Sequence, residues 1–472
     1  ILLAMLLRAL ALAALTFSAA CSDGAKVGAP SQSHPNIILV SLDTCRADRL
    51  SPYEGGAYTS PFLAEFAKES VVFTDCIAQS SNTGPSHRSL FTGQYPHRHQ
   101  HTTFQYARSP YMMAGLLKDA GYRTAGFAGG GFLDADLGFG QGFDPSTCKN
   151  DQGETPTRRG FRSILPQAEN WLSTHKSRGD NASANPFFLF LHTYDIHCPY
   201  WPKPKYRQQF SPDYEGPLDL RTLCGRSDFD QLFTPESAAG PIDLAHLQNM
   251  YDGGIAMTDD LFGQFMNQLR DDGVLENTMV IVTSDHGESL GEHQWVGHNH
   301  MWEEQLRVPL MIRFPDGAHA GQRVDAPTML VDILPTVLSQ LQLPTPSAVQ
   351  GESLLPYIDG VADGANRMRV AEYLDFFSFR FDSRWKAIVE IQSDGRLKTW
   401  LFDLENDPAE INNLANTEAG AKRLDEMIAK FQQFRAETAA DDAHYKGFEL
   451  GADVSPELAA ELDELGYSGF DD

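Results

Sequence analysis

The sequence is short of basic residues, of cysteine and of long apolar runs. Lys and Arg together number 37 against 63 Asp and Glu, so the formal net charge is −26. This balance excludes nucleic-acid binding through a basic face, and no polybasic stretch is present for anionic lipid. Six cysteines in 472 residues are too few for a disulfide scaffold. The 42% of hydrophobic residues is typical of a globular protein, and the length predicts one large domain with a smaller one.

The N-terminus is predicted to be a targeting segment. Residues 1–20, the predicted signal peptide, carry Arg8, an apolar run and small residues before Cys21. This pattern favours a bacterial lipoprotein signal with lipid on the Cys21 thiol, although Ser18 stands where Leu is usual. A plain secretory signal is the alternative. We expect an exported protein, periplasmic or at the cell surface, with residues 21–35 as a tether and membrane contact only through that lipid.

Apolar runs and helical patterns alternate along the chain. Short runs rich in branched or aromatic residues predict buried strands at 36–42, 123–128, 187–194, 278–284 and 307–313. Apolar residues at helical spacing predict helices at 60–70, 112–122, 256–273 and 328–342. This order predicts an α/β fold with a mostly parallel central sheet and helices on both faces.

A smaller unit is predicted after the main domain. The runs at 385–391 and 399–404 predict a small antiparallel sheet. We therefore expect a main domain at 36–365, a C-terminal subdomain at 366–436 and an acidic tail at 437–472. The tail holds 11 acids and one Lys, a net charge of 1 − 11 = −10, and is predicted to be a solvated helical appendage.

Candidate chemistry collects where two predicted strands end. Asp43 follows the strand at 36–42, and Asp285 and His286 follow the strand at 278–284. Ligands of open α/β sheets bind beyond the carboxyl ends of the strands, and two carboxylates with an imidazole predict a divalent-metal site. Each residue alone is more often a helix N-cap or turn residue. The segment SDHGESLGEH favours a ligand role, because burying so many polar groups in a structural loop is costly.

The segment SSNTGPSHRSLFTG at 80–93 is a third candidate element. Gly84 and Pro85 predict a sharp turn before a helix. A hydroxyl on such a turn can point outward beside a helix N-terminus that is able to bind an anion. The alternative is an ordinary Ser or Thr N-cap.

Six motifs occur in the order seen in one known family. These are LDTCRADRL, the turn ending in LFTG, DIHCPY, SDHGESLGEH, RVPLMIR and LFDLENDPAEINNL. From about residue 35 to 415 the chain resembles sulfatases of the alkaline phosphatase superfamily. The resemblance implies a metal-bound ester hydrolase with a central sheet and a small C-terminal sheet subdomain.

Two departures from the family pattern change the expected chemistry. Thr83, Pro85 and His87 align with a C/S-x-P-x-R motif whose first residue becomes formylglycine, and Thr is not a substrate for that conversion. Thr44 replaces the second acid of the usual Asp-Asp pair. The remaining Asp43, Thr83, Asp285 and His286 resemble the metal-plus-threonine site of superfamily members that move phosphoryl groups.

These residues predict a threonine nucleophile. A divalent cation held by Asp43, Thr83, Asp285 and His286 lowers the pKa of the Thr83 hydroxyl and aims it at the ester. Phosphothreonine can be resolved by water, whereas sulfothreonine lacks the easy elimination open to a formylglycine hydrate. Phosphoester hydrolysis or phosphotransfer is therefore favoured. An imidazole ligand from His286, and Thr44 in place of a carboxylate, leave the site with fewer hard oxygen ligands. This favours Zn²⁺ or Mn²⁺ over Ca²⁺, and Mg²⁺ is a further alternative.

Four further side chains are candidates for the substrate side. By the resemblance, His298 and His197 align with groups near the leaving oxygen, and an imidazole can protonate it near working pH. His87 and Arg88 are predicted to bind the anionic group of the substrate. For each of them the alternative is a core or surface residue with local hydrogen bonds.

Two other functions stay open on the sequence. The first is a sulfatase that works without formylglycine, and the second is an inactive exported binding protein with the same fold. The substrate class is a small anionic ester, or an ester linked to a glycan or lipid. No motif identifies the substrate itself.

Overall fold

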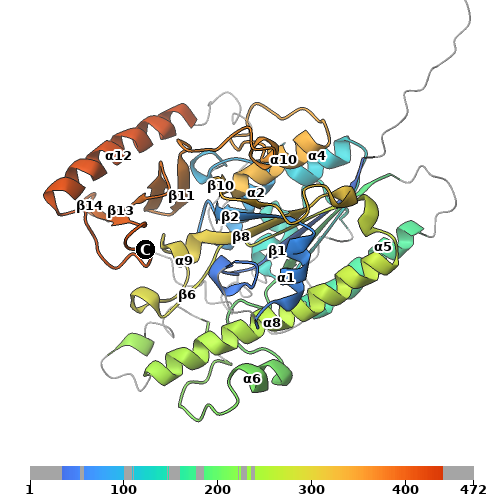
Figure 1. Ribbon diagram of the computed structural model, residues 1–472, viewed down its shortest axis with the longest axis horizontal. Coiled ribbons are helices and arrows are strands. Elements are labelled where there is room, and N and C mark those ends of the chain that lie inside the picture. Colours follow the sequence, from blue (N-terminus) through green and yellow to red (C-terminus); the bar gives the residue numbers. More distant parts are fainter. Residues whose placement is uncertain are drawn as a thin grey trace, which may run out of the picture. The chain divides into compact units, whose positions relative to one another are not determined.

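An eight-stranded sheet lies at the centre of the computed structural model (Figure 1). The structure describes residues 34–438 except 54–57, 100–108, 110, 146, 148–159, 177–184, 222, 225–230 and 235–239. The predicted signal peptide, the lipid site at Cys21, nearly all of the tether and all but two residues of the acidic tail lie outside this range. Among the described helices, none is both long and apolar enough to cross a membrane.

The central sheet is mostly parallel, which confirms the predicted fold class. Its strand order is β10-β2-β8-β5-β1-β4-β3, and β9 pairs with β2. The bounds are β1 Asn36–Leu42, β2 Val71–Ile77, β3 Arg123–Ala128, β4 Phe187–Thr193, β5 Thr278–Thr283, β8 Arg307–Arg313, β9 Arg323–Val324 and β10 Thr328–Met329. β1 pairs in parallel with both β4 and β5, whereas β8 runs antiparallel to β2 and β5.

Helices cover both faces of this sheet, because β1 sends alternate side chains to two separate cores. Ile37 and Leu39 belong to the core under α2, α4 and α10. Ile38 and Val40 belong to the core under α1, α5 and α8. The bounds are α1 Pro61–Lys68, α2 Thr83–Thr92, α4 Met113–Asp119, α5 Phe161–Lys176, α8 Pro241–Asp271 and α10 Ile333–Gln340. The two sets lie on opposite sides of the sheet in Figure 1.

Two predicted helices have different bounds in the structure. Helix α8 begins at Pro241 rather than 256 and passes through Gly253 and Gly254. Gly254 is required by packing, since a Cβ there would lie 2.9 Å from the Asp195 carbonyl oxygen. The segment predicted as one helix at 328–342 begins with β10, which pairs in parallel with β2, and a 3-10 turn precedes α10.

The C-terminal part carries the predicted antiparallel sheet. Its order is β11-β12-β13-β14, with bounds Arg369–Tyr373, Phe376–Arg380, Trp385–Ile391 and Leu397–Asp403. Helix α12 (Glu418–Thr438) packs Leu424, Met427 and Phe431 on one face of this sheet. Residues Met301 and Leu306, from the segment before β8, pack on the other face. The sheet therefore adjoins the loop that carries His298.

Candidate active site

The strand register brings the predicted site residues together. Asp43 follows β1, and Asp285 and His286 follow the neighbouring β5. Thr83 is the first residue of α2. All four side chains are fully buried. We call Asp43, Thr83, Asp285 and His286 the strand-end cluster.

The Thr83 hydroxyl lies inside this cluster. Its Oγ1 is 3.5 Å from Asp43 Oδ2 and 3.4 Å from His286 Nε2. His286 Nδ1 is 2.9 Å from the Gly287 carbonyl oxygen, so Nδ1–H donates there and Nε2 keeps its lone pair toward Thr83. Helix α2 begins at Thr83, so its N-terminal dipole favours negative charge at this point.

The cluster has ligand atoms for a cation. The carboxylate and imidazole atoms of Asp43, Asp285 and His286 lie within 4.8 Å of one another. Asp43 Oδ1 and Asp285 Oδ2 are buried and have no hydrogen-bond partner among the described residues. Burial and the nearby carboxylates of Asp285 and Glu288 raise the pKa of Asp43 well above its usual value. Uncompensated carboxylates beside a neutral imidazole fit a divalent cation.

Backbone geometry fixes this arrangement. Asp285 Oδ1 accepts hydrogen bonds from the backbone amides of Thr44 (3.2 Å) and His286 (2.9 Å). Thr44 adopts φ 57°, a conformation that costs a β-branched residue about 1–3 kcal/mol. Gly287 contacts the segment before β8, where a Cβ would lie 2.0 Å from the Glu304 carbonyl oxygen. The loop after β5 therefore has little freedom.

Two buried residues beside the cluster were missed by the sequence analysis. His192 on β4 lies with Nε2 at 2.9 Å from Asp43 Oδ2. Burial raises the pKa of Glu288 to about 8, with Tyr200 opposing the shift and Asp285 adding to it. His192 is the last residue but one of β4, which pairs with β1, so knowledge of the strand order would have pointed to it. Glu288 stands in SDHGESLGEH, but no spacing rule distinguishes it from a surface acid.

The structure buries His87 and Arg88 completely. His87 Nδ1–H donates to the Thr83 carbonyl oxygen at 2.9 Å, and Nε2 lies 2.9 Å from Ser41 Oγ. Burial lowers the pKa of His87 to about 3, so the ring is neutral. His87 thus ties α2 to β1 beneath the cluster. Substrate binding by His87 and Arg88 stays a prediction.

His298 and His197 lie on the His286 side of the cluster. The His298 ring is 4.5 Å from the His286 ring and 5.6 Å from the His197 ring, between centroids. His298 Nδ1 lies 3.1 Å from both the Ser81 carbonyl oxygen and Asn299 Oδ1. Burial and the two neighbouring imidazoles lower its pKa. The structure therefore places both predicted proton donors together.

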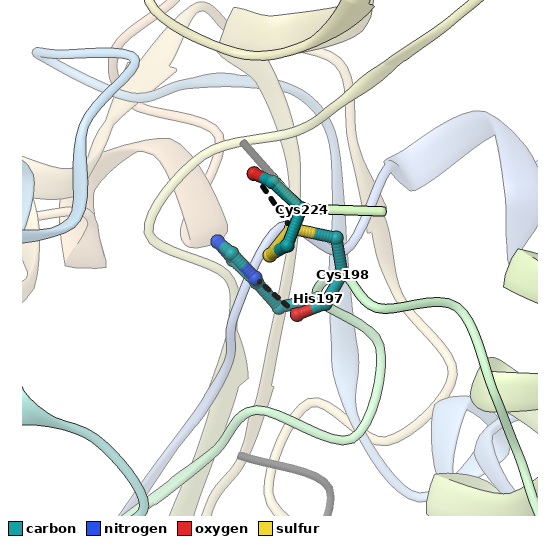
Figure 2. A group of neighbouring side chains, drawn as sticks. All are labelled: His197, Cys198 and Cys224. Carbon is teal, nitrogen blue, oxygen red and sulfur yellow. Dashed lines mark hydrogen bonds between the residues drawn. A yellow bond between two sulfur atoms is a disulfide. The ribbon is translucent and has the colours of Figure 1, made fainter. Parts of the chain in front are cut away.

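His197 also adjoins a disulfide that the sequence did not identify. Cys198 and Cys224 are bonded to each other, and His197 Nδ1–H donates to the Cys198 carbonyl oxygen at 2.9 Å (Figure 2). The imidazole and the two sulfurs lie as close together as metal ligands do. Because the sulfurs form a disulfide, neither is a thiolate, and this group is no metal site.

Comparison with protein families identifies the chain. A family model described as Sulfatase matches residues 35–343, well over half of the sequence. The chain belongs to the sulfatase family. A second model, N-sulphoglucosamine sulphohydrolase, C-terminal, matches residues 291–437. Sulfatase-family proteins are ester hydrolases, and the chain is therefore a hydrolase that acts on ester bonds.

Curated relatives within the family carry different names. The N-acetylglucosamine-6-O-sulfatase of Bacteroides thetaiotaomicron is 25% identical, covering 93% of this chain and 92% of that protein. The multifunctional alkaline phosphatase superfamily protein PehA of Trinickia caryophylli is also 25% identical, covering 88% of this chain and 98% of that protein.

Solved structures share the fold. The phosphonate monoester hydrolase of Agrobacterium radiobacter has a TM-score of 0.67 at 22% identity, covering 86% of this chain and 96% of that one. A protein in complex with its substrate D-glucosamine-2-N,6-O-disulfate has a TM-score of 0.68 at 22% identity, covering 88% and 98%. The sulfatase-type architecture is thus shared with proteins named for different esters.

Proposed function

We propose that the protein is a metal-dependent phosphoester hydrolase or phosphotransferase with Thr83 as its nucleophile. The position of the Thr83 hydroxyl, between Asp43 Oδ2 and His286 Nε2 at the start of α2, carries this proposal. A buried hydroxyl aimed at uncompensated carboxylates has no evident structural purpose. It is placed as a nucleophile should be.

The strand-end cluster is the proposed metal site. Asp43, Asp285 and His286 would hold the cation together with the Thr83 hydroxyl. When bound, a divalent cation offsets the carboxylate charge and lowers the pKa of a hydroxyl beside it. One imidazole, one hydroxyl and two carboxylates favour Zn²⁺ or Mn²⁺, with Ca²⁺ and Mg²⁺ as alternatives. His192 orients the Asp43 carboxylate through its Nε2–H.

The proposed reaction has two steps at phosphorus. Thr83 Oγ1 forms a bond to phosphorus as the bond to the leaving oxygen breaks, and its proton passes to Asp43 Oδ2, the carboxylate oxygen it already faces. Water, or an acceptor hydroxyl, then forms a bond to phosphorus as the bond from phosphorus to Thr83 Oγ1 breaks. Thr83 Oγ1 takes back the proton from Asp43, and the proton lost by the attacking group passes to the imidazole that protonated the leaving oxygen. The N-terminus of α2 stabilises charge on the non-bridging oxygens.

His298 and His197 are proposed to act on the leaving group. In the free protein, burial lowers the pKa of both imidazoles. An anionic ester bound beside them favours their protonated forms, and this raises the pKa toward the working range. Either ring can then protonate the leaving oxygen. His87 and Arg88, which both belong to α2, are proposed to help hold the anionic group of the substrate.

A sulfatase that works without formylglycine is the second candidate. The name of the relative from Bacteroides thetaiotaomicron favours it. The phosphonate monoester hydrolase among the structural neighbours favours the phosphorus-centred reaction. An inactive protein that binds no ion is less consistent with the site, because Asp43 and Asp285 each bury one carboxylate oxygen that has no hydrogen-bond partner among the described residues, and a bound cation would offset that cost.

A parallel assay separates these functions. The metal-supplemented protein is tested on nitrophenyl phosphate, bis-nitrophenyl phosphate and nitrophenyl sulfate. We expect phosphoester turnover, lost roughly 10³-fold or more in Thr83→Ala and retained in part in Thr83→Ser, which keeps the hydroxyl. Sulfate turnover alone would favour the sulfatase. Full activity of folded Thr83→Ala would refute the nucleophile, and no turnover of any ester would favour the binding protein.

Export is also part of the proposal. The Cys198–Cys224 disulfide supports an oxidising compartment such as the periplasm or cell surface. A small anionic ester, or one linked to a glycan or lipid, is the proposed substrate class. Cell fractionation tests the anchor: Cys21→Ser should release the protein from the membrane fraction, and unchanged membrane association would contradict a lipid on Cys21.

A further inference from the structure

His298, one of the two proposed proton donors, belongs to a hydrogen-bond network that begins beside the nucleophile. Its Nδ1 lies 3.1 Å from both the Ser81 carbonyl oxygen and Asn299 Oδ1. Asn82 Nδ2 donates to the same Asn299 Oδ1 at 3.1 Å. Asn82 directly precedes Thr83 in the chain. The network therefore joins the residues just before the nucleophile to the loop that carries His298.

This network fixes which nitrogen of the His298 ring carries the proton. The Ser81 carbonyl oxygen can only accept a hydrogen bond, so Nδ1 is the donor. Asn299 must then turn its oxygen toward Nδ1, and Asn82 must turn its amide nitrogen toward that oxygen. In the neutral ring Nε2 is therefore the unprotonated nitrogen, and it is the atom that takes up and releases a proton.

Both amides have little freedom to turn away. The Asn82 side chain is fully buried, and its Nδ2 also donates to the Tyr373 hydroxyl of β11 at 3.4 Å. The Asn299 backbone N–H donates to the Ser81 carbonyl oxygen at 3.4 Å. Asn299 adopts φ 81°, in the left-handed region that asparagine tolerates better than most other residues. The position thus suits an asparagine in its backbone as well as in its amide.

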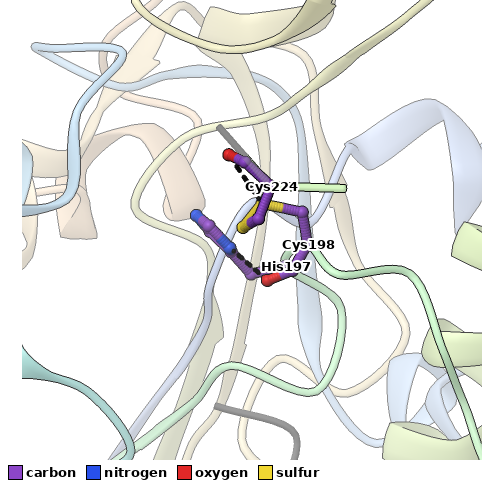
Figure 3. The surroundings of a disulfide bond; sticks show 3 residues. All are labelled: His197, Cys198 and Cys224. Atoms are coloured by element: carbon purple, nitrogen blue, oxygen red, sulfur yellow. Dashed lines mark hydrogen bonds between the residues drawn. A yellow bond between two sulfur atoms is a disulfide. The ribbon is translucent and has the colours of Figure 1, made fainter. Parts of the chain in front are cut away.

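Two other imidazoles at the site also donate through Nδ1, but to their own chain neighbours. His286 and His197 each donate to the carbonyl oxygen of the next residue at 2.9 Å, and Figure 3 shows this contact for His197. Those acceptors are backbone atoms, which a substitution does not remove. For His298 one acceptor is a side chain, that of Asn299. Its contribution can therefore be measured by mutation.

We propose that Asn299 is a positioning residue, held by Asn82, that keeps the proton of His298 on Nδ1 so that Nε2 is the nitrogen that protonates the leaving oxygen. When Nε2 gains a proton, Nδ1–H keeps its oxygen acceptors, and these stabilise the imidazolium. The proton then passes from Nε2 to the leaving oxygen as the bond from that oxygen to phosphorus breaks. The catalytic part of this inference rests on the role of His298 in the proposed function.

The ratio of two rates tests the positioning role. The leaving oxygen of phenyl phosphate is more basic than that of nitrophenyl phosphate, so its departure depends more on protonation. The ratio of kcat/KM for phenyl phosphate to that for nitrophenyl phosphate reports this dependence, and losses common to both esters cancel. If the assay above shows sulfate turnover, the corresponding sulfates are compared instead.

Two substitutions of Asn299 should change this ratio differently. Asn299→Gly removes the amide at a position where glycine adopts φ 81° without strain, and it should lower the ratio about tenfold. Asn299→Asp keeps an acceptor oxygen, so its ratio should stay within about twofold of the wild-type value. A wild-type ratio in Asn299→Gly would overturn the inference and leave Thr83 as the nucleophile. Equal losses in the two variants would also overturn it.

A double variant separates positioning from a general structural role. His298→Gln should lower the ratio at least as far as Asn299→Gly does. His298→Gln/Asn299→Gly should lower it no further, because the amide acts through the imidazole. A further loss in the double variant would contradict the inference.

Asn36→Ala is the matched control. Asn36 is half-buried, as Asn299 is, and its amide also makes hydrogen bonds, to Thr278 and Phe187. It begins β1, whereas Asp43 follows the other end of that strand. Asn36→Ala should lower stability and leave the ratio unchanged. A fall equal to that of Asn299→Gly would overturn the inference.

A measurement without turnover keeps this inference distinct from the proposed function. Nitrogen NMR of the whole chain, labelled in its histidines and free of substrate, locates the His298 proton, and comparison with His298→Gln assigns the signals. We expect the proton on Nδ1, and a proton on Nε2 would overturn the inference. If no ester is turned over but the proton lies on Nδ1, the proposed function is refuted and the assignment of the proton to Nδ1 stands.

Discussion

At the junction with the C-terminal sheet, buried or half-buried acids lie against buried bases, whereas at the ends of β1 and β5 buried acids face one another. The first group is the junction cluster: Asp75, Glu303, Glu410, Arg369, Arg380 and Lys386. Lys386 Nζ lies 3.0 Å from Glu303 and 2.8 Å from Glu410, and Arg380 lies 3.0 Å from Glu303. Arg369 pairs with Asp75.

Glu303 of the junction cluster and Asp43 of the strand-end cluster have pKa values shifted in opposite directions. Burial raises the pKa of Glu410, the other acid beside Lys386, to about 7. Burial would raise the pKa of Glu303, but Lys386 and Arg380 outweigh it and hold that pKa at about 2. In the strand-end cluster burial and like charges raise the pKa of Asp43. A buried cluster whose positive and negative charges balance is typical of a structural role. Buried carboxylates without a positive counter-charge are typical of a site that binds a ligand.

Removing one base from the junction cluster should give the largest change. Lys386→Met leaves Glu303 and Glu410 buried with less compensation, so we expect a loss of about 3–5 kcal/mol in the free energy of unfolding, measured by urea denaturation. Lys398→Met is the control, because Lys398 lies on the adjacent β14 with its side chain 57% exposed. It should cost less than about 1 kcal/mol. Equal losses would show that the junction cluster is not structural.

Acid should remove the stability that Glu303 contributes to the junction cluster. The pKa of Glu303 is about 2 in the folded protein and 4.5 as its ordinary value, so its contribution to stability is complete above pH 4.5 and is lost as the pH falls toward 2. Glu303→Gln should remove up to about 3 kcal/mol of this pH-dependent stability. Glu405→Gln, at an exposed acid, should leave the pH profile of unfolding unchanged. A wild-type acid profile in Glu303→Gln would contradict the assignment.

A divalent cation should stabilise the strand-end cluster. At a concentration of 100 Kd it adds about 2.7 kcal/mol to the free energy of unfolding, and a chelator should remove this gain. Asp43→Asn should lose most of the gain, and its chelated form should be as stable as the chelated wild type or more so, since a buried charge is gone. Thermal melts with Zn²⁺, Mn²⁺ or chelator measure both effects. Exposed Asp213→Asn is the control, and a metal shift kept in Asp43→Asn would remove Asp43 from the site.

The smallest effect concerns the contact that joins the two regions. Gly287→Ala would place a Cβ 2.0 Å from the Glu304 carbonyl oxygen, next to Glu303 of the junction cluster. We expect a loss of about 1–3 kcal/mol and lower ester turnover, because the Asp285 loop must shift. Gly115→Ala in α4 meets open space and should stabilise the protein by about 0.5–1 kcal/mol. Unchanged stability and unchanged turnover in Gly287→Ala would show that the backbone at this contact can shift to accommodate a Cβ.

Much of the fold could be predicted because its signals are local. The run NIILVSL matches β1 at both ends, and WKAIVEI matches β13. Helix α8 was predicted too short, because Gly253 and Gly254 weaken a helical pattern. Only the tertiary structure shows that Gly254 faces the Asp195 carbonyl oxygen and that Gly253 faces Pro202. The direction of β8 was not predictable, since an apolar run has no orientation until it pairs.

Local patterns were enough to place Asp43, Asp285 and His286 at strand ends, since an apolar run followed by polar residues can be recognised without the fold. The sequence also identified Thr83 as the residue at the motif position, through resemblance to the family. Three contacts emerge only from the folded chain: His192 hydrogen-bonds Asp43, His87 lies beneath the cluster, and Cys198 is bonded to Cys224. Each of these contacts joins elements brought together by strand order or loop packing. Such contacts depend on distances in space, which residue spacing along the chain does not encode.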